Sequence, residues 1–384
     1  MQDLIVIGGG VVGLSVAWEA ARRGLKVLVL ERDRLGKSAS WAGAGILPPP
    51  AGPGATHPLE VLGRRAWHLH AEWAELLPQA SGIATGYRQC GGLYLSDRPG
   101  DAAALSAVAM AWEEEGWNFE LLTDRQRRDR FPELEASAGI EKVLRSLWAP
   151  QESQLRNPRH LQALVAACRA AGVTLLERTE IDRLEQRAQG WSVRSAEGSW
   201  QADQVCVAGG AWTRSVIASL GIVVDIVPIR GQMALYQFDR PPFDYVMNVG
   251  PRYIVPRDDG HVLVGSTEEE AGFDISTTDE GLAGLREFAL RWLPEAAQRE
   301  PLRTWAGLRP SAVDGFPYIG LVPRADGLSL AAGHFRAGLT LSPATAEMLV
   351  DLITGKTPQI DPTPFSPARG WSGRTTSLLR GSGS

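Results

Sequence analysis

Cysteine is scarce in this chain of 384 residues, which contains Cys90, Cys168 and Cys206 and no other. Their number is odd, their spacings are long and no C-x-x-C pair occurs, which excludes a redox-active dithiol motif and argues against a disulfide framework. This pattern predicts a protein of the reducing cytoplasm. The six histidines form no metal-ligand pattern with the cysteines. We expect His68 and His70 to be surface residues, and we expect no metal site.

Long apolar runs and basic stretches are also missing. The apolar stretch from Leu4 to Leu30 is interrupted by Arg22, Arg23 and Lys26, so we expect neither a membrane span nor a secretory signal. The formal net charge of -5 and the lack of a basic patch argue against a nucleic-acid partner, whose phosphates require clustered Lys and Arg. Residues 366–384 end in a stretch rich in Gly, Ser, Thr and Arg, which predicts a flexible tail.

The first 31 residues read as a strand, a glycine-rich turn, a helix and a second strand. Leu4 to Ile7 form a continuous apolar run, as expected for a parallel strand buried on both faces. A helix is predicted from about Val11 to Arg23, and the apolar run that follows ends in Glu31. This is the pattern of a βαβ unit.

The turn between the first strand and the helix carries the spacing of a dinucleotide-binding loop. Gly8 permits the tight turn, Gly10 lets a diphosphate approach the helix N-terminus, and Gly13 allows helix and strand to pack closely. Glu31 can accept hydrogen bonds from ribose hydroxyls and would repel a 2′-phosphate, which disfavours NADP. These residues alone do not decide between FAD and NAD.

The remainder of the chain alternates helical and strand-like segments. Residues 173–208 and 228–268 have strand patterns, with a hairpin at Asp259-Gly260. Ser342 and Pro343 are expected to open a late helix as N-cap and first residue. We therefore predict an α/β (α+β overall) fold with a Rossmann-like nucleotide-binding domain and a second, antiparallel-sheet substrate domain. The first would comprise residues 1–80, 150–220 and 300–365, and the second residues 81–149 and 221–299.

Several separated motifs accompany the glycine loop. They are S-A-S-W-A-G-A-G-I-L at 38–47, V-A-G-G-A-W at 207–212, P-I-R-G-Q at 228–232, Y-I-V-P-R at 253–257, G-S-T at 265–267, W-A-G-L-R-P at 305–310, D-G-F-P-Y-I-G at 314–320 and G-H-F-R-A-G at 333–338. With them, residues 3 to about 365 resemble the D-amino acid oxidase family of flavoproteins, and most of all its glycine-oxidising members in thiamine synthesis.

This resemblance implies that the nucleotide-binding domain holds FAD. Attachment would be noncovalent, since the cysteine that holds flavin in monomeric sarcosine oxidases lies in the C-terminal part, where this chain has none. The implied FAD contacts are Gly8, Gly10, Val11, Val12, Gly13, Glu31, Arg32, Ser38, Ser40, Ala44, Gly45, Ile46, Leu47, Gly209, Gly333, His334, Phe335, Arg336, Gly338, Leu339 and Thr340.

The resemblance also implies the substrate-binding residues. Arg309 matches the family's carboxylate-binding arginine, whose planar fork can pair both oxygens, and Tyr253 matches a tyrosine that donates a second hydrogen bond. Arg336 matches an arginine near the active site and either contacts substrate or holds its loop. Arg257 is expected to be structural. Glu268 stands where some relatives carry an apolar residue. Facing the pocket, it could attract an amine or exclude acidic side chains, but we expect it to face solvent without a role.

The implied reaction transfers a hydride from the α-carbon of a small amino acid to the flavin. Glycine is the first expectation, with sarcosine or small D-amino acids as further substrates. The imine would hydrolyse to a 2-oxo acid and ammonia, and O2 would be reduced to H2O2. Catalysis would depend on positioning and electrostatics, with no general base.

Other functions stay open at this point. They are a D-amino acid dehydrogenase that passes electrons to a partner, a sarcosine oxidase-like enzyme, a flavin-holding subunit of a complex, and, with less support, a tRNA-modifying relative or an NAD enzyme. A homo-oligomer is also compatible with the resemblance.

Overall fold

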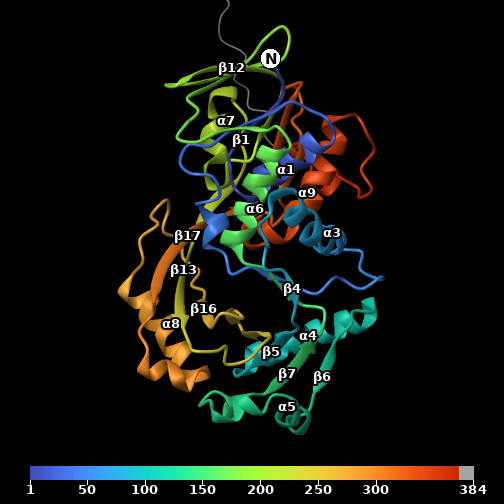
Figure 1. Ribbon diagram of the computed structural model, residues 1–384. Coiled ribbons are helices and arrows are strands. Elements are labelled where there is room, and N and C mark those ends of the chain that lie inside the picture. Colours follow the sequence, from blue (N-terminus) through green and yellow to red (C-terminus); the bar gives the residue numbers. More distant parts are fainter. Residues whose placement is uncertain (372–384) are drawn as a thin grey trace, which may run out of the picture.

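A computed structural model describes residues 1–371 of the protein and shows two parts stacked end to end (Figure 1). The upper part in Figure 1 contains α1 (Val11–Arg22), α9 (Gly338–Ile353) and β1 (Gln2–Ile7). The lower part contains α5 (Asp124–Arg130) and α8 (Asp279–Trp292). This arrangement confirms the predicted α/β (α+β overall) fold class.

The upper part is built on an eight-stranded sheet with a parallel centre. Its main path runs in the order β10 (Arg183–Gln186), β11 (Trp191–Ser195), β12 (Gly198–Val207), β1, β2 (Val27–Leu30) and β9 (Thr174–Leu176). Off this path, β12 pairs in parallel with β19 (Leu328–Ala332), which pairs antiparallel with β18 (Tyr318–Leu321).

Two cores cover the faces of this sheet. Leu4 and Val6 face one core, which they share with α1, α9, α3 (Pro58–Ser81) and α6 (Asn157–Ala170). Ile5 and Ile7 face the other core, to which α7 (Thr213–Ile217) contributes. Successive residues of a strand point to opposite faces, so burial on both sides requires the continuous apolar run seen in β1.

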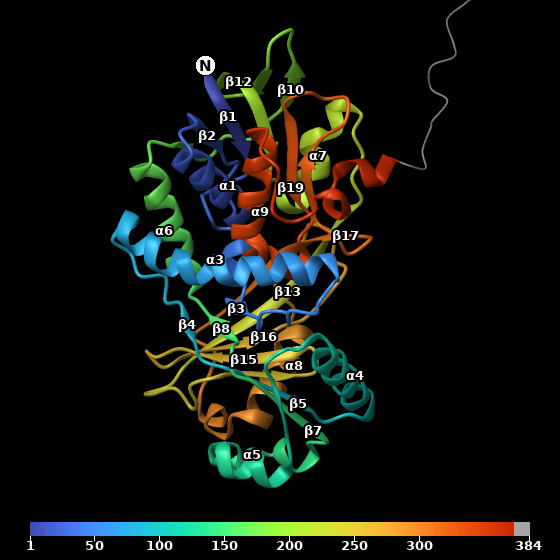
Figure 2. The ribbon, with the colours of Figure 1, turned by 90° about the vertical axis from the view of Figure 1, so that its right-hand side faces the viewer.

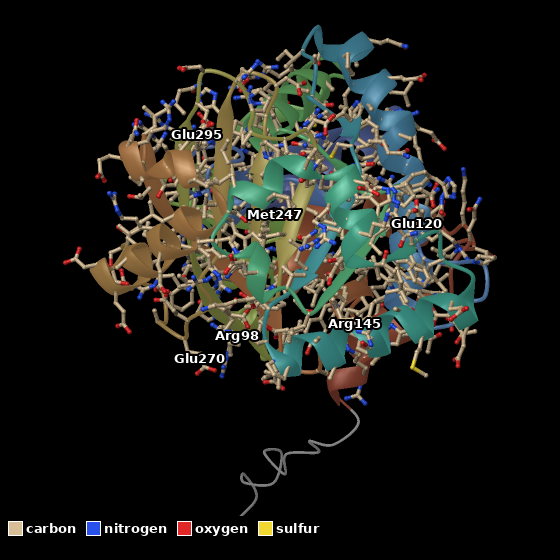
Figure 3. The ribbon with its side chains drawn as sticks, turned by 90° about the horizontal axis from the view of Figure 1, so that it is seen from below. Arg98, Glu120, Arg145, Met247, Glu270 and Glu295 are labelled. Atoms are coloured by element: carbon tan, nitrogen blue, oxygen red, sulfur yellow. The ribbon has the colours of Figure 1, made fainter. Side chains whose placement is uncertain are left out.

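The lower part is an eight-stranded, mostly antiparallel sheet. Its order is β17 (Arg303–Ala312), β13 (Ile226–Gln237), β16 (His261–Gly265), β15 (Arg252–Pro256), β14 (Val246–Val249), β5 (Gly92–Ser96), β7 (Arg145–Ala149) and β6 (Glu120–Leu122). The pairing of β14 with β5 is parallel. Its core includes residues of α8, and α4 (Pro99–Glu115) lies against β5 and β7. In Figure 3, the buried Met247 lies near the middle, whereas Arg98, Glu120 and Glu270 lie toward the outline.

A small three-stranded sheet lies between the two parts (Figure 2). It contains β3 (Ile46–Leu47), β8 (Ser153–Gln154) and β4 (Arg88–Gln89). The division of the chain into two domains stays a proposal. Within it, β17 belongs to the 300–365 segment that we assigned to nucleotide binding, yet it pairs along its length with β13 of the lower sheet. Among residues 1–371, none of the helices combines the length and apolarity that crossing a membrane requires.

The late helix begins earlier than predicted, at Gly338 and not at Ser342. Pro343 therefore lies inside α9 and leaves the carbonyl of Leu339 without its usual amide donor. Ser342 Oγ donates to this carbonyl at 3.0 Å, and His70 Nε2 donates to it at 3.1 Å. A second acceptor, Thr340 O, lies 3.0 Å from the same nitrogen. The side chains of Ser342 and His70 thus replace the backbone donor that Pro343 lacks.

The expectation that His70 is a surface residue is wrong. It is 2% exposed in α3, facing α9, and burial lowers its pKa to about 4. The neutral imidazole of His70 can donate its Nε2 hydrogen to the carbonyls of Leu339 and Thr340, so this contact between α3 and α9 does not require a charged ring. The predicted tail also differs at its start: Pro367–Trp371 form a short 3-10 helix, and Arg369 Nε donates to Asp314 Oδ2 at 2.7 Å. Residues 372–384 lie outside the described residues.

The buried carboxyl group of Glu152 should make the free energy of unfolding depend on pH. Glu152 is 0% exposed, accepts from the Tyr94 hydroxyl and from Asn248 Nδ2, and has its pKa raised to about 7, mainly by burial. The pKa of Glu152 is higher in the folded than in the unfolded state. Its contribution to the free energy of unfolding is therefore fully present below pH 4.5 and is lost as pH rises through 7. The loss should be on the order of 2–3 kcal/mol.

We expect Glu152→Gln to remove this pH dependence, because an amide does not ionise. Urea unfolding of the two proteins from pH 4.5 to pH 8 should show the variant gaining stability relative to the original as pH rises. Glu141→Gln, which changes an exposed carboxylate, is the control. Parallel pH profiles for Glu152→Gln and the unchanged protein would contradict the assignment.

Candidate active site

A cavity of about 540 Å³ extends between the two parts and brings the predicted site residues together. Its lining includes Gly8–Val12 and Ser38–Ser40 from the upper part, and Tyr253 and Arg309 from the lower sheet. Three predicted FAD contacts do not line it: Gly13, Leu47 and Gly333. The other predicted contacts do, including Glu31, Arg32 and Gly338–Thr340.

The glycine loop has the backbone geometry that its sequence predicts. Gly8 has φ +110, and a Cβ there would lie 2.4 Å from Ala208 O. A Cβ on Gly13 would lie 2.0 Å from Gly8 O, so this residue acts through packing under the loop and not by lining the cavity. Gly10 is the N-cap of α1 and offers no side-chain cap, which leaves the helix N-terminus open to an anion.

Glu31 and Ser40 organise the same loop. Glu31 Oε2 accepts from Gly9 N at 2.7 Å, and its Oε1 accepts from Asp33 N at 2.9 Å. Ser40 Oγ accepts from Val11 N at 2.9 Å. Each oxygen keeps a further lone pair, so these side chains can hold the loop and still meet a ribose or diphosphate.

Residues 42–46 pass along the cavity with little room behind them. Gly45 has φ +77, and a Cβ there would lie 2.0 Å from Leu155 O. Arg257, which is 5% exposed, donates from Nη2 to Ala44 O at 2.6 Å and from Nη1 to Gln154 Oε1. Burial lowers the pKa of Arg257 to about 9. Arg257 is therefore a structural tie from the lower sheet to this stretch, as expected from the sequence.

Arg309 lies on β17 with its guanidinium at the cavity and held by neutral groups. Nη1 donates to Thr267 O at 3.1 Å and to Arg230 O at 3.4 Å, and Nη2 donates to Ser266 Oγ at 2.7 Å. Burial is the main reason why the pKa of Arg309 is lowered. No salt bridge to Arg309 is found in residues 1–371, so its charge is available to an anion that enters the cavity.

A glycine makes room for this guanidinium. A Cβ on Gly231 would lie 2.2 Å from both terminal nitrogens of Arg309. Gly231 belongs to the P-I-R-G-Q motif at 228–232, for which sequence reasoning found no physical role. The close approach explains why a residue without a side chain stands at this position of β13.

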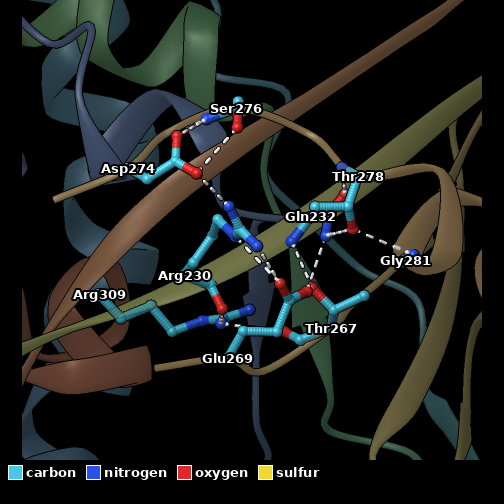
Figure 4. Close-up of polar contacts among 9 residues, drawn as sticks. All are labelled: Arg230, Gln232, Thr267, Glu269, Asp274, Ser276, Thr278, Gly281 and Arg309. Atoms are coloured by element: carbon cyan, nitrogen blue, oxygen red, sulfur yellow. Dashed lines mark hydrogen bonds and ion pairs between the residues drawn. The ribbon is translucent and has the colours of Figure 1, made fainter. Parts of the chain in front are cut away.

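The same motif supplies a polar network that the sequence analysis missed (Figure 4). Arg230, which is 6% exposed, donates to Glu269 Oε2 at 3.0 Å and to Asp274 Oδ2 at 2.7 Å. Gln232 Nε2 donates to Glu269 Oε1 at 2.7 Å and to Thr278 Oγ1 at 2.9 Å. These contacts fix the loop between β16 and α8, which carries the carbonyl that holds Arg309.

Tyr253 lies on β15 with its hydroxyl beside a weak acceptor. Its hydroxyl donates to Met233 Sδ at 3.3 Å, and both residues line the cavity. A Cβ on Gly265 would lie 2.3 Å from Met233 Sδ and 2.9 Å from Tyr253 Cε2. Because a thioether is a poor acceptor, a carboxylate in the cavity would compete well for this hydroxyl.

Arg336 lies in the short 3-10 helix η6 (Phe335–Ala337) and forms an ion pair with Glu268. The side chain of Glu268 is 46% exposed, in line with the expectation that it faces solvent, and its ion pair with Arg336 is a contact that the sequence did not indicate. The neighbouring His334 is 5% exposed, and its Nε2 lies 3.0 Å from Thr345 Oγ1. Burial lowers the pKa of His334 to about 3, so it is neutral.

Comparison with known proteins places this site in context. Residues 3–352 match the sequence model of the family DAO, described as FAD dependent oxidoreductase. Glycine oxidase of Pseudomonas aeruginosa is 35% identical, covering 96% of this chain and 99% of that protein. The bifunctional protein ThiO/ThiG of Synechocystis is 32% identical over 96% of this chain and 54% of its own length. The crystal structure of glycine oxidase from Geobacillus kaustophilus has a TM-score of 0.90 at 29% identity, covering 96% of this chain and 98% of that one.

The geometry of Arg309 predicts a loss of carboxylate binding in Arg309→Leu. Removing the guanidinium deprives a small carboxylate of its charge partner in a desolvated site, and the loss of affinity should be about 2–4 kcal/mol. Titration of the flavin-loaded protein with acetate or glycolate, followed by absorbance, measures it. Arg194→Leu, on the exposed face of β11, should bind as before. Equal affinities in the two variants would remove Arg309 from the site.

Glu31→Ala tests the nucleotide end of the cavity. The change leaves two backbone amides without their acceptor, so FAD retention should fall by about tenfold or more. Equilibrium dialysis of free FAD measures the dissociation constant. Asp33→Ala is the control, because it removes an exposed carboxylate that lies close by in the sequence. If FAD binding is unchanged in Glu31→Ala, the carboxylate does not organise the loop.

Proposed function

Because the chain belongs to the DAO family of FAD-dependent oxidoreductases, we propose that it oxidises glycine to glyoxylate and ammonia. One O2 and one water would be consumed and one H2O2 released per glycine. The similarity to glycine oxidases and to ThiO/ThiG proteins supports this substrate and a role in thiamine biosynthesis. We extend the proposal to sarcosine and small D-amino acids as further substrates.

The observation that carries the proposal is the guanidinium of Arg309, which has no ion-pair partner among residues 1–371 and lines the cavity that also contains the glycine loop. A partly buried cation whose hydrogen-bond partners among residues 1–371 are all neutral favours an anionic ligand, and its planar fork suits a carboxylate. The hydroxyl of Tyr253 can donate a second hydrogen bond. Two such contacts fix the orientation of a molecule as small as glycine, which has few other groups to recognise.

The residues of the cavity fit FAD. The open N-terminus of α1 and Ser40 suit the diphosphate, Glu31 suits the ribose, and the closely packed stretch 42–46 leaves space for a flat ring. Gly338–Thr340 add the N-terminal residues of α9, whose amides and dipole favour negative charge. When bound, FAD supplies the acceptor for a hydride from the α-carbon of the substrate.

The chain's own contribution is to bind and orient. Arg309 and Tyr253 hold the carboxylate, which places the α-carbon at a defined position in the cavity. Met233 and Ser266, which accept hydrogen bonds from Tyr253 and Arg309, cannot act as bases at neutral pH. The amine must therefore lose its extra proton to water before or during binding, and its lone pair then assists departure of the hydride.

Several finer points belong to the same proposal. O2 as the acceptor agrees with the similarity to proteins named oxidases. A cytoplasmic location agrees with three cysteines that form no disulfide. A homo-oligomer rests on the family resemblance alone.

An anaerobic assay tests the proposal. Glycine should bleach the oxidised flavin spectrum of the purified protein, and readmitted air should restore it with one H2O2 per glyoxylate formed. Sarcosine, D-alanine and D-proline should bleach it more slowly as the substituent grows. Flavin that stays oxidised with all four compounds would refute an amine oxidase. Bleaching without prompt reoxidation by air would indicate a dehydrogenase instead.

A further inference from the structure

Two guanidinium groups line the cavity near the expected substrate, and their partners differ. The hydrogen-bond partners of Arg309 are backbone carbonyls and the hydroxyls of Ser266 and Tyr253. Arg336 is paired with the carboxylate of Glu268. Within the part of the chain that the structure describes, these two cations at the substrate end of the cavity therefore differ: Arg309 has no ion-pair partner, and Arg336 is already neutralised.

The backbone on each side of Glu268 is fixed, so the position of its side chain is not accidental. Thr267 N donates to Gln232 O at 3.3 Å, and Glu269 N donates to Arg230 O at 3.0 Å. In return, Arg230 N donates to Glu269 O at 2.8 Å. Glu268 is thus held beside β13 and directed at η6, where Ala337 N donates to His334 O at 2.9 Å.

The other acids of this loop have different partners. Glu269 and Asp274 pair with Arg230 in the network of Figure 4. Burial is the main reason why the pKa of Arg309 is lowered; Arg336 lowers it further, and Glu268 acts in the opposite direction. Both members of the Arg336–Glu268 pair are therefore close enough to influence the group that would hold the substrate carboxylate.

We propose that Glu268 restricts this site to substrates with a single carboxylate. By pairing with Arg336, it removes the cation that a second carboxylate would otherwise bind. Such a second group occurs on the nitrogen in iminodiacetate and on the side chain in D-aspartate. This inference rests on the proposed function, since it assumes that Arg309 receives the first carboxylate.

The test compares Glu268→Gln with Glu270→Gln in the FAD-loaded enzyme. Glu270 is exposed on the same loop, so its change removes one negative charge two positions away. Binding of a monocarboxylate, glycolate, and of a dicarboxylate, malonate, is followed by the change in flavin absorbance. The dissociation constant of malonate divided by that of glycolate should fall roughly fivefold in Glu268→Gln and stay constant in Glu270→Gln.

The same ratio measured in an Arg336→Gln background separates two causes. If Glu268 acts by neutralising Arg336, adding Glu268→Gln to Arg336→Gln leaves the ratio unchanged. A fivefold fall that persists without Arg336 would overturn the proposal, because it would show direct repulsion by Glu268. A ratio that behaves alike in Glu268→Gln and Glu270→Gln would overturn it as well.

Binding of glycolate and malonate does not require turnover. The proposal for Glu268 and the proposed glycine oxidation can therefore be refuted independently of each other. Absence of flavin reduction by glycine would refute the proposed function and leave the ratio measurable. Once glycine oxidation is established, iminodiacetate and D-aspartate should gain kcat/KM relative to glycine in Glu268→Gln. No gain with either compound would count against Glu268 as a determinant of specificity.

Discussion

The site depends on keeping a desolvated guanidinium without a carboxylate partner. Arg309 meets this requirement because its donors are satisfied by Thr267 O, Arg230 O and Ser266 Oγ, which carry no net charge. A buried cation is costly unless it is hydrogen-bonded, yet a permanent ion pair would occupy the fork that the substrate needs. Neutral acceptors satisfy the hydrogen bonds and leave the charge available.

Much of the surrounding structure follows from this constraint. Acids are present on the adjacent loop, but Glu269 and Asp274 are engaged by Arg230, and Glu268 is engaged by Arg336. The carbonyl of Arg230 accepts a hydrogen bond from Arg309, while its side chain pairs with Glu269 and Asp274. One residue of β13 therefore both supports the substrate-binding arginine and separates it from negative charge.

At the nucleotide end of the cavity, backbone amides and not charged side chains provide the binding groups for the diphosphate. The open N-terminus of α1, the tight contact between Gly13 and Gly8, and the bond from Glu31 to Gly9 are all local to the first βαβ unit. The glycine spacing predicted the tight turn and the close packing of this unit, because these residues are near one another in sequence; the bond from Glu31 to Gly9 was not predicted. Arg257 joins this end to the lower sheet through Ala44, which only the packing of the two parts brings together.

The sequence by itself determined the βαβ unit, the fold class and the residue types that suit a dinucleotide and a carboxylate, because strand and helix periodicity and glycine spacing are local properties. It did not determine which partners the charged side chains have. His70 has the sequence surroundings of a surface residue but serves a carbonyl that Pro343 leaves free more than 250 residues later, and Glu268 meets Arg336 from another element. Such pairings join residues that are distant in sequence, so only the tertiary structure decided which cation remains free for substrate.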